Sequence, residues 1–199
     1  MTEGARHDGR QMDELRPVKI ELGVNVHAEG SCLVEMGRTR VWITASVEDR
    51  VPPHRRGSGH GWITAEYSML PRSTHDRGTA DGGTRTASIT GAFAALYMAL
   101  KKMKDARMIE AVPVRHYMAA VSCGVIDAIP RLDLDYTEDF QASTDLNCVM
   151  TEDGRMIELQ ATAEGAPYSR AELDAMISLA HKGIKELIVH QKRAIASLG

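Results

Sequence analysis

Short runs in which apolar and polar residues alternate dominate the first third of the chain. Three such runs cover residues 18–22, 32–36 and 41–47, and a fourth covers residues 62–70. A period of two is typical of β-strands, so this region is predicted to hold four strands, with a hairpin between the second and the third. Residues 51–61 contain three Gly, two Pro and no hydrophobic period, and they predict an exposed basic loop.

The next pattern has the period of an α-helix. Large apolar residues recur at steps of three and four positions, namely Ile89, Phe93, Leu96, Tyr97, Leu100 and Met103. This spacing predicts an amphipathic helix of about 18 residues with these side chains as its apolar face. A second long helix is predicted at the end of the chain, where Ser169 and Glu172 have the spacing of a capping box.

A second β-like region lies between the two helices. Its strand-like pieces cover residues 117–127, 131–136, 145–151 and 156–163, and residues 152–155 (Glu-Asp-Gly-Arg) form a hairpin turn signal. The order is strands, helix, strands, helix, with hairpin connections. This order predicts the α+β class, as a two-layer sandwich of two similar β-rich halves that are each closed by a helix. We expect residues 1–199 to form a single domain.

Composition and charge limit the partners that the chain could attract. Of the 199 residues, 43% are hydrophobic and 26% are charged, which excludes a disordered or collagen-like chain. The formal net charge is −3, so the chain cannot coat a nucleic acid through its overall charge. Any polyanion would have to meet a local basic patch.

The three cysteines, Cys32, Cys123 and Cys148, have neither metal-ligand nor redox-motif spacing. We expect reduced thiols that are buried in strands, which indicates a reducing compartment and a cytoplasmic location. No apolar run approaches the roughly 18 residues that a membrane-spanning helix needs, so we expect no membrane partner.

A glycine-rich stretch leads directly into the first predicted helix. Residues 81–88 read Asp-Gly-Gly-Thr-Arg-Thr-Ala-Ser. The glycines allow close backbone approach, the helix start presents N–H groups, and Arg85 adds a forked donor, so the stretch suits a phosphate group. A plain helix cap made by Thr or Ser is an equally open alternative. The sequence contains neither a P-loop nor a dinucleotide-binding motif.

Two further groups of charged residues add to this picture. Five carboxylates gather within thirteen residues, namely Asp133, Asp135, Glu138, Asp139 and Asp145. Such a cluster can hold Mg²⁺, although it can also be a solvated sheet edge. Two loops concentrate cations that could hold a phosphate backbone or merely solvate the loops: Arg55 with Arg56, and Arg72 with Arg77. A phosphate-binding helix start together with a carboxylate cluster points to phosphoryl transfer.

Several longer stretches carry a more specific signal than any single motif. They include Gly61-Trp62-Ile63-Thr64-Ala65-Glu66-Tyr67, Met69-Leu70-Pro71-Arg72-Ser73-Thr74-His75, residues 80–92, Leu134-Asp135-Tyr136 and Thr144-Asp145-Leu146-Asn147. With shorter matches, they cover nearly the whole chain. In this order they resemble the ribonuclease PH family of bacterial phosphorolytic exoribonucleases.

The resemblance implies a fold like ribosomal protein S5 domain 2 and a phosphate-dependent 3′-to-5′ exoribonuclease. Such an enzyme trims the 3′ end of transfer RNA precursors, releases nucleoside diphosphates, and forms a ring of six subunits as a trimer of dimers. By position, Thr84 and Arg85 match the phosphate-binding pair of the family, Asp139 and Asp145 match its catalytic and Mg²⁺-associated aspartates, and Arg72 and Arg77 fall in the RNA-contacting segment. The backbone of Gly83 is added to the phosphate-binding set because it precedes Thr84 at the predicted helix start. Arg55 and Arg56 are added to the RNA-binding set because of the basic loop that they form.

The chain departs from the family between Thr79 and Ala80. There the family has a basic loop, a helix and a further strand, and with them a second phosphate-contacting arginine that Arg77 could replace. The chain is either a minimal enzyme with an internal deletion or a sequence that omits residues present in the protein. A non-catalytic RNA-binding ring subunit is therefore the alternative function.

Overall fold

A three-stranded antiparallel sheet forms the first half of the protein. The computed structural model describes residues 6–70, 73 and 82–199, and the structural statements below concern these residues. The sheet consists of β1 (Val18–Leu22), β2 (Gly30–Met36) and β3 (Thr39–Ala45), with β2 in the centre. Gly37, with a φ of +58°, makes the tight turn between β2 and β3. The three strands predicted before residue 48 are thereby confirmed.

A four-stranded antiparallel sheet forms the second half. Its order is β5 (Ile129–Leu132), β4 (Met118–Ile126), β6 (Thr144–Thr151) and β7 (Met156–Ala163). Gly154, with a φ of +83°, lies in the predicted turn between β6 and β7, which confirms this hairpin.

The short helix α2 (Tyr136–Gln141) was not predicted. The expected strand over residues 131–136 is wrong in its second half, because β5 ends at Leu132 and Asp135 then caps α2. Asp135 and Glu138 form a complete capping box, a signal that was present in the sequence.

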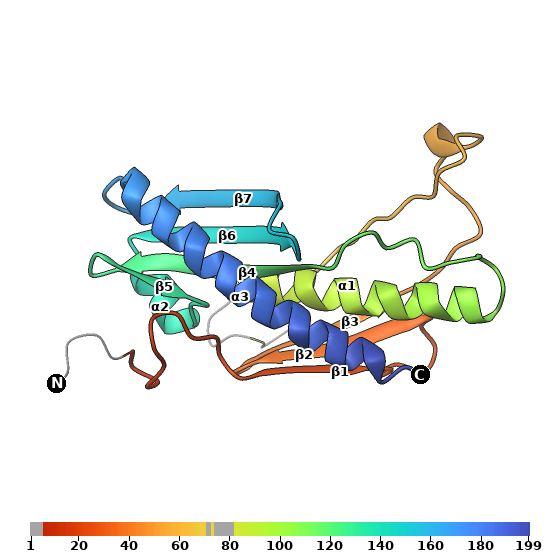
Figure 1. Cartoon of the computed structure of the whole chain (residues 1–199), viewed down its shortest axis with the longest axis horizontal. Helices are drawn as coiled ribbons and strands as arrows, with labels where there is room; N and C mark the ends of the chain where they lie inside the picture. Colours follow the sequence, from red (N-terminus) through yellow and green to blue (C-terminus); the bar gives the residue numbers. More distant parts are fainter. Residues whose placement is uncertain (1–5, 71–72, 74–81) are drawn as a thin grey trace.

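Two long helices connect the sheets. Helix α1 (Gly82–Asp105) packs on β2, β3 and β4, whereas α3 (Arg170–Ala196) packs on β4, β5 and β1 (Figure 1). Ser169 caps α3 with the predicted capping box. The buried side chains of both sheets form one continuous core, and the expected α+β class is confirmed. No helix of the described residues is long and apolar enough to cross a membrane.

Helix α1 lies unusually close to the first sheet. A Cβ at Gly30 of β2 would be only 1.9 Å from the carbonyl oxygen of Ala95, so glycine is required there. The side of α1 that faces the core consists mainly of small residues, with Ala87, Ala94, Ala95 and Ala99 buried. The predicted apolar face is therefore only partly in the core: Phe93 is buried, but Ile89, Leu96, Leu100 and Met103 are half-buried.

Residues 61–70, which we call the 61–70 segment, form no strand, and the prediction of a fourth strand is wrong for this structure. The segment is extended, and all of its residues are exposed except the half-buried Met69. The physical reason is that no described strand lies beside it to pair with its backbone. The preceding residues 51–60 are exposed as predicted, apart from the partly buried residues 51–52, and contain one short 3₁₀ turn (Pro53–Arg55).

Candidate active site

The glycine-rich stretch forms the first turn of α1 itself, since the helix begins at Gly82. A Cβ at Gly83 would lie 2.8 Å from Nη2 of Arg16 and 3.2 Å from the carbonyl oxygen of Leu134. Glycine at this position therefore lets the start of α1 pack against the residues that lead into α2. This contact joins the predicted phosphate site to the acidic region.

Hydroxyl groups in the first turns of α1 bond within the helix. The Thr86 Oγ1 donates to the carbonyl of Gly83 at 3.2 Å, and the Ser88 Oγ donates to that of Thr84 at 2.8 Å. Both of these bonds run to backbone carbonyls within the helix, and the helix cap of the alternative interpretation stays a prediction.

Arg85 reaches from α1 to the second sheet. Its Nη2 donates to Oε1 of Glu158 on β7 at 2.7 Å, and its side chain is 31% exposed. Its Nη1 is buried and has no hydrogen-bond partner among the described residues. A buried guanidinium N–H without an acceptor is costly, so this atom is suited to receive an oxygen of an anion.

The structure divides the acidic cluster. Asp133 is completely buried and accepts hydrogen bonds from the backbone N–H of Arg16 at 2.7 Å and from its Nη2 at 2.8 Å. Glu138 is equally buried and is bound by Arg6, Arg10 and Arg131. Both carboxylates therefore hold the N-terminal segment against the second sheet and are unavailable for catalysis.

Asp135 also has a structural task. Its Oδ1 accepts from the N–H of Glu138 at 3.0 Å as the cap of α2, and its Oδ2 lies 2.7 Å from Nε2 of His7. His7, Asp135 and Glu138 form the single group of three potential metal ligands within the described parts of the chain. Because three guanidinium groups already surround Glu138, a cation would be repelled there, and we assign no metal to this group.

Asp139 and Asp145 remain as candidates for metal binding. Asp139 lies in α2, Asp145 lies near the start of β6, and only Ala142 and Ser143 separate these two elements. Asp145 is half-buried and accepts a hydrogen bond from Nδ2 of Asn147 at 3.1 Å. Carboxylate oxygens at such positions fit the preference of Mg²⁺ for hard ligands.

The strand register relates Asp145 to Arg85. Asp145 is paired with Thr162, and Glu158 with Val149, so Asp145 and Glu158 point to the same face of the second sheet. Through Glu158, the Arg85 guanidinium lies on this face as well. The sequence contained no signal for Glu158, which lies in an ordinary strand pattern, whereas Asn147 belongs to the stretch 144–147 that carried the family resemblance.

The predicted RNA-binding arginines are only partly described. Arg55 and Arg56 are exposed, and the Arg55 guanidinium lies 5.4 Å from the ring centroid of Trp62. Arg72 and Arg77 lie outside the described residues.

The three cysteines are buried as expected. Burial raises the pKa of Cys32 to about 12 and that of Cys148 to about 11, and it also raises the pKa of Cys123. Burial therefore favours the neutral thiol form of all three at neutral pH.

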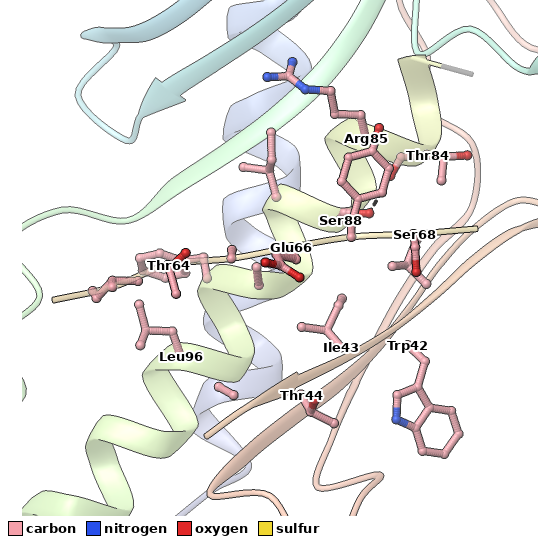
Figure 2. Close-up of a pocket in the computed structure, with 18 of the residues that line it drawn as sticks. Trp42, Ile43, Thr44, Thr64, Glu66, Ser68, Thr84, Arg85, Ser88 and Leu96 are labelled. Carbon is pink, nitrogen blue, oxygen red and sulfur yellow. Dashed lines mark hydrogen bonds between the residues drawn. The ribbon is translucent and has the colours of Figure 1, made fainter. Parts of the chain in front are cut away.

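A large hollow extends from the start of α1 along the helix. It is bounded by β3, the 61–70 segment and α1, and Thr84, Arg85 and Ser88 lie at one end (Figure 2). Asp135, Tyr136 and Thr137 line the same hollow. The candidate phosphate site is therefore accessible from a wide opening.

Comparison with known proteins decides the family. Residues 14–80 match the profile of the 3′ exoribonuclease family, domain 1, and residues 116–183 match domain 2. A curated relative, ribonuclease PH of Syntrophomonas wolfei subsp. wolfei, is 44% identical over 232 residues, which cover 94% of this chain and 97% of the relative. The chain belongs to the ribonuclease PH family of 3′ exoribonucleases. The resemblance inferred from the motifs is thus confirmed.

Solved structures of similar fold agree with this membership. An Archaeoglobus fulgidus exosome with RNA bound to the active site has a TM-score of 0.74 at 21% identity, covering 94% of this chain and 92% of that one. Rice (Oryza sativa) Rrp46 has a TM-score of 0.68 at 17% identity, covering 96% and 100%. Because these sequence identities are low, the two similarities establish only the fold of this chain.

The comparison also bears on the expected gap. The alignment to the Syntrophomonas protein spans 232 positions, whereas the whole chain has 199 residues, so this family relative has residues that the chain lacks. The domain 1 match ends at residue 80, next to the predicted gap between Thr79 and Ala80.

Proposed function

We propose that the chain is a phosphate-dependent 3′-to-5′ exoribonuclease that trims the 3′ end of transfer RNA precursors and releases nucleoside diphosphates. Its membership of the ribonuclease PH family supports this activity. Arg85 at the start of α1 carries the assignment to a site, because its buried Nη1 has no acceptor within the described parts of the chain. Gly83 and Thr84 complete the proposed phosphate site.

In the proposed reaction, the protein contributes mainly by positioning the reactants and by stabilising charge. An oxygen of inorganic phosphate attacks the phosphorus of the terminal nucleotide in line with the departing 3′ oxygen. A P–O bond to phosphate forms and the bond to the 3′ oxygen breaks. That oxygen takes up the proton that the attacking phosphate loses and becomes a hydroxyl. Arg85 and the N–H groups of the first helix turn orient the nucleophile and stabilise the negative charge. The reaction is reversible, because the phosphodiester bond that breaks and the anhydride bond that forms have similar free energies of hydrolysis.

Asp139 and Asp145 are proposed as the catalytic carboxylates and as the residues that hold Mg²⁺. The ion would supply positive charge beside the reacting phosphoryl group. The half-buried position of Asp145, on the sheet face that Arg85 reaches, supports this assignment. The Asn147 amide fixes one oxygen of Asp145, so its carboxylate has a defined orientation.

The proposal is tested by incubating the chain with a 3′-tailed transfer RNA precursor, with and without inorganic phosphate. We expect nucleoside diphosphates to be released only with phosphate. Arg85→Ala should lower this release about 10²–10³-fold, because a charge-stabilising donor is lost, while RNA binding changes little. Arg170→Ala, at an exposed side chain on α3, is the matched control.

Two outcomes would contradict the assignment. Release of nucleoside monophosphates without phosphate would indicate hydrolysis. RNA binding without any release would favour the alternative, a non-catalytic ring subunit.

We further propose that the subunits assemble into a ring of six, as a trimer of dimers, which binds RNA with a single-stranded 3′ end. The solved structures of similar fold include an archaeal exosome core, with a TM-score of 0.72 at 20% identity, covering 94% of this chain and 91% of that one. The cytoplasmic location remains a prediction.

A further inference from the structure

The candidate phosphate site contains a carboxylate beside its guanidinium. Glu158 of β7 accepts a hydrogen bond from Nη2 of Arg85 through its Oε1, at 2.7 Å. Within the described residues, no group donates a hydrogen bond to its second oxygen, Oε2. The two side chains are 39% and 31% exposed, and an ion pair that water reaches so well adds little stability. Stability alone therefore does not account for a carboxylate next to an anion site.

The backbone of β7 is irregular at the point where Glu158 meets Arg85. Glu158 pairs with Val149 of β6, but the next residue of β6, Met150, pairs with Met156. Ile157 is thereby left without a partner residue, as in a β-bulge. Bulges change the direction of neighbouring side chains and are frequent beside active sites. The position of Glu158 is thus set by a local feature of the strand and not only by its contact with Arg85.

The two terminal nitrogens of Arg85 are in different situations. Nη2 is bound to Glu158, whereas Nη1 is buried and has no acceptor among the described residues. Both nitrogens belong to one planar guanidinium, so an anion that binds at Nη1 comes to lie beside the Glu158 carboxylate. Two anions repel each other, and two acceptors form no hydrogen bond unless one of them carries a proton. The carboxylate therefore opposes binding of an anion that has no proton to offer.

We propose that Glu158 makes this site selective for protonated oxyanions: it accepts a hydrogen bond from a P–OH group of inorganic phosphate held by Arg85, and it rejects sulfate. Near neutral pH, inorganic phosphate keeps at least one proton, whereas sulfate keeps none. Both anions are tetrahedral and similar in size, so the guanidinium and the helix start alone distinguish them poorly. A group that is left facing a like charge without a hydrogen bond is an effective means of discrimination.

This inference rests on the proposed phosphate site, but it concerns binding and does not require turnover. The test is therefore an equilibrium measurement on the full chain without RNA, by isothermal titration calorimetry at pH 7 and constant ionic strength. The probes are inorganic phosphate, arsenate and sulfate. Arsenate is protonated at this pH as phosphate is, so we expect these two anions to bind with similar affinity. Sulfate should bind at least about tenfold more weakly.

A substitution at Glu158 tests the cause of this difference. Glu158→Gln keeps the size of the side chain and an acceptor for Arg85, but its amide can donate to sulfate. We expect the ratio of phosphate affinity to sulfate affinity to fall about tenfold, mainly because sulfate binds more tightly. Glu158→Ala also removes the carboxylate and should lower the ratio in the same direction. Glu164→Gln, at an exposed glutamate that follows β7, is the matched control and should leave the ratio unchanged.

The ratio is informative because a damaged fold would weaken both anions together. Far-ultraviolet circular dichroism checks that each variant is folded. Arg85→Ala should abolish phosphate binding, which shows that the measured heat comes from this site.

The outcomes separate this inference from the proposed activity. Equal affinities of the unaltered chain for phosphate and sulfate, or an unchanged ratio in folded Glu158→Gln, would overturn the role of Glu158 and leave the proposed phosphorolysis intact. If the folded chain binds no phosphate, the site itself is wrong, and the inference falls with it. The expected selectivity in a chain that releases no nucleoside diphosphate would support the role of Glu158 and count against the activity alone.

Discussion

Glu138 shows how one side chain can control the stability of the whole N-terminal region. Burial alone would raise the pKa of this carboxyl, but the hydrogen bond and charge of Arg6, with Arg10 nearby, lower it overall. Glu138 also accepts from Nη1 of Arg131 at 3.3 Å. This carboxylate supplies a counter-charge to Arg6, whose other hydrogen bonds go to backbone carbonyls such as those of Leu132 and Asp133, and it shares Arg10 with Asp8 and Asp133.

Replacement of this carboxylate should therefore destabilise the fold. We expect Glu138→Gln to lower the free energy of unfolding at pH 7 by about 3–5 kcal/mol, because the buried Arg6 and the largely buried Arg131 lose the carboxylate with which they pair. Urea unfolding measures the change. Glu164→Gln, at an exposed position, is the control and should have little effect.

The same carboxyl predicts a pH dependence. Its pKa in the folded protein is below the unfolded value of about 4.5, so its contribution is fully present above that pH and is lost as the pH falls through the folded pKa. The difference between the unaltered chain and Glu138→Gln should shrink as the pH falls below about 4.5. An equal difference at neutral and acid pH would contradict this account.

The candidate catalytic carboxylates lead to a different expectation. Asp139→Asn and Asp145→Asn keep the side-chain volume but remove the charge, so each should lower phosphate-dependent release by about a hundredfold or more without loss of fold. A titration of Mg²⁺ should show a weaker apparent affinity in each variant. Asp153→Asn, in the exposed β6–β7 turn, is the control. Full activity in either variant would remove that residue from the site.

At the scale of elements, the contact between α1 and β2 positions the phosphate site. Because Gly30 brings β2 to within van der Waals distance of the α1 backbone, the direction of α1 is determined along its middle turns. The start of the helix is held independently by Gly83 against Leu134. Two glycines therefore place Arg85 relative to both sheets.

Addition of one methyl group tests this contact. Gly30→Ala should lower the free energy of unfolding by about 3 kcal/mol, because the new Cβ would overlap with the carbonyl of Ala95 and force α1 away from β2. Thermal or urea unfolding measures it. Gly165→Ala, where a Cβ would meet no atom within 4 Å, should be nearly neutral. Equal stability of the two variants would show that α1 can shift away from β2 without a cost in free energy.

At the scale of the whole molecule, a chain with a net charge of −3 must concentrate its cations to bind RNA. Residues 51–60 project from the body at the upper right of Figure 1, and Arg55 and Arg56 in this stretch are exposed. In a ring, each subunit would contribute one pair of these arginines. An RNA bound at one pair would be held near the others, so the high effective concentration would make binding at several pairs cooperative.

Removal of these cations should therefore weaken RNA binding without regard to sequence. Arg55→Ala and Arg56→Ala should each lower the affinity for unrelated RNAs about equally and reduce the slope of log affinity against log salt by up to about one unit. Binding assays across a salt series, with sedimentation to establish the assembly, measure both effects. Salt-insensitive binding, or full affinity in a monomer, would contradict the prediction.

Much of this protein follows from its sequence. Period-two runs located seven strands, the capping box at Ser169 located α3, and the ordered motifs identified the family. These features are local or are carried by residue identity. They need no knowledge of which residues meet across the fold.

The remaining features were decided by the tertiary structure, because each of them depends on contacts between residues that are distant in the sequence. The composition and spacing of the acidic cluster do not separate Asp133 and Glu138 from Asp139 and Asp145. In the structure, ion pairs with arginines of the N-terminal segment give Asp133 and Glu138 a structural role. The 61–70 segment has the pattern of a strand but forms none, since a strand exists only when another backbone pairs with it. Likewise, Ile89, Leu96, Leu100 and Met103 of α1 line a hollow, because the close approach to β2 favours small residues, mainly alanines, on the buried side of the helix.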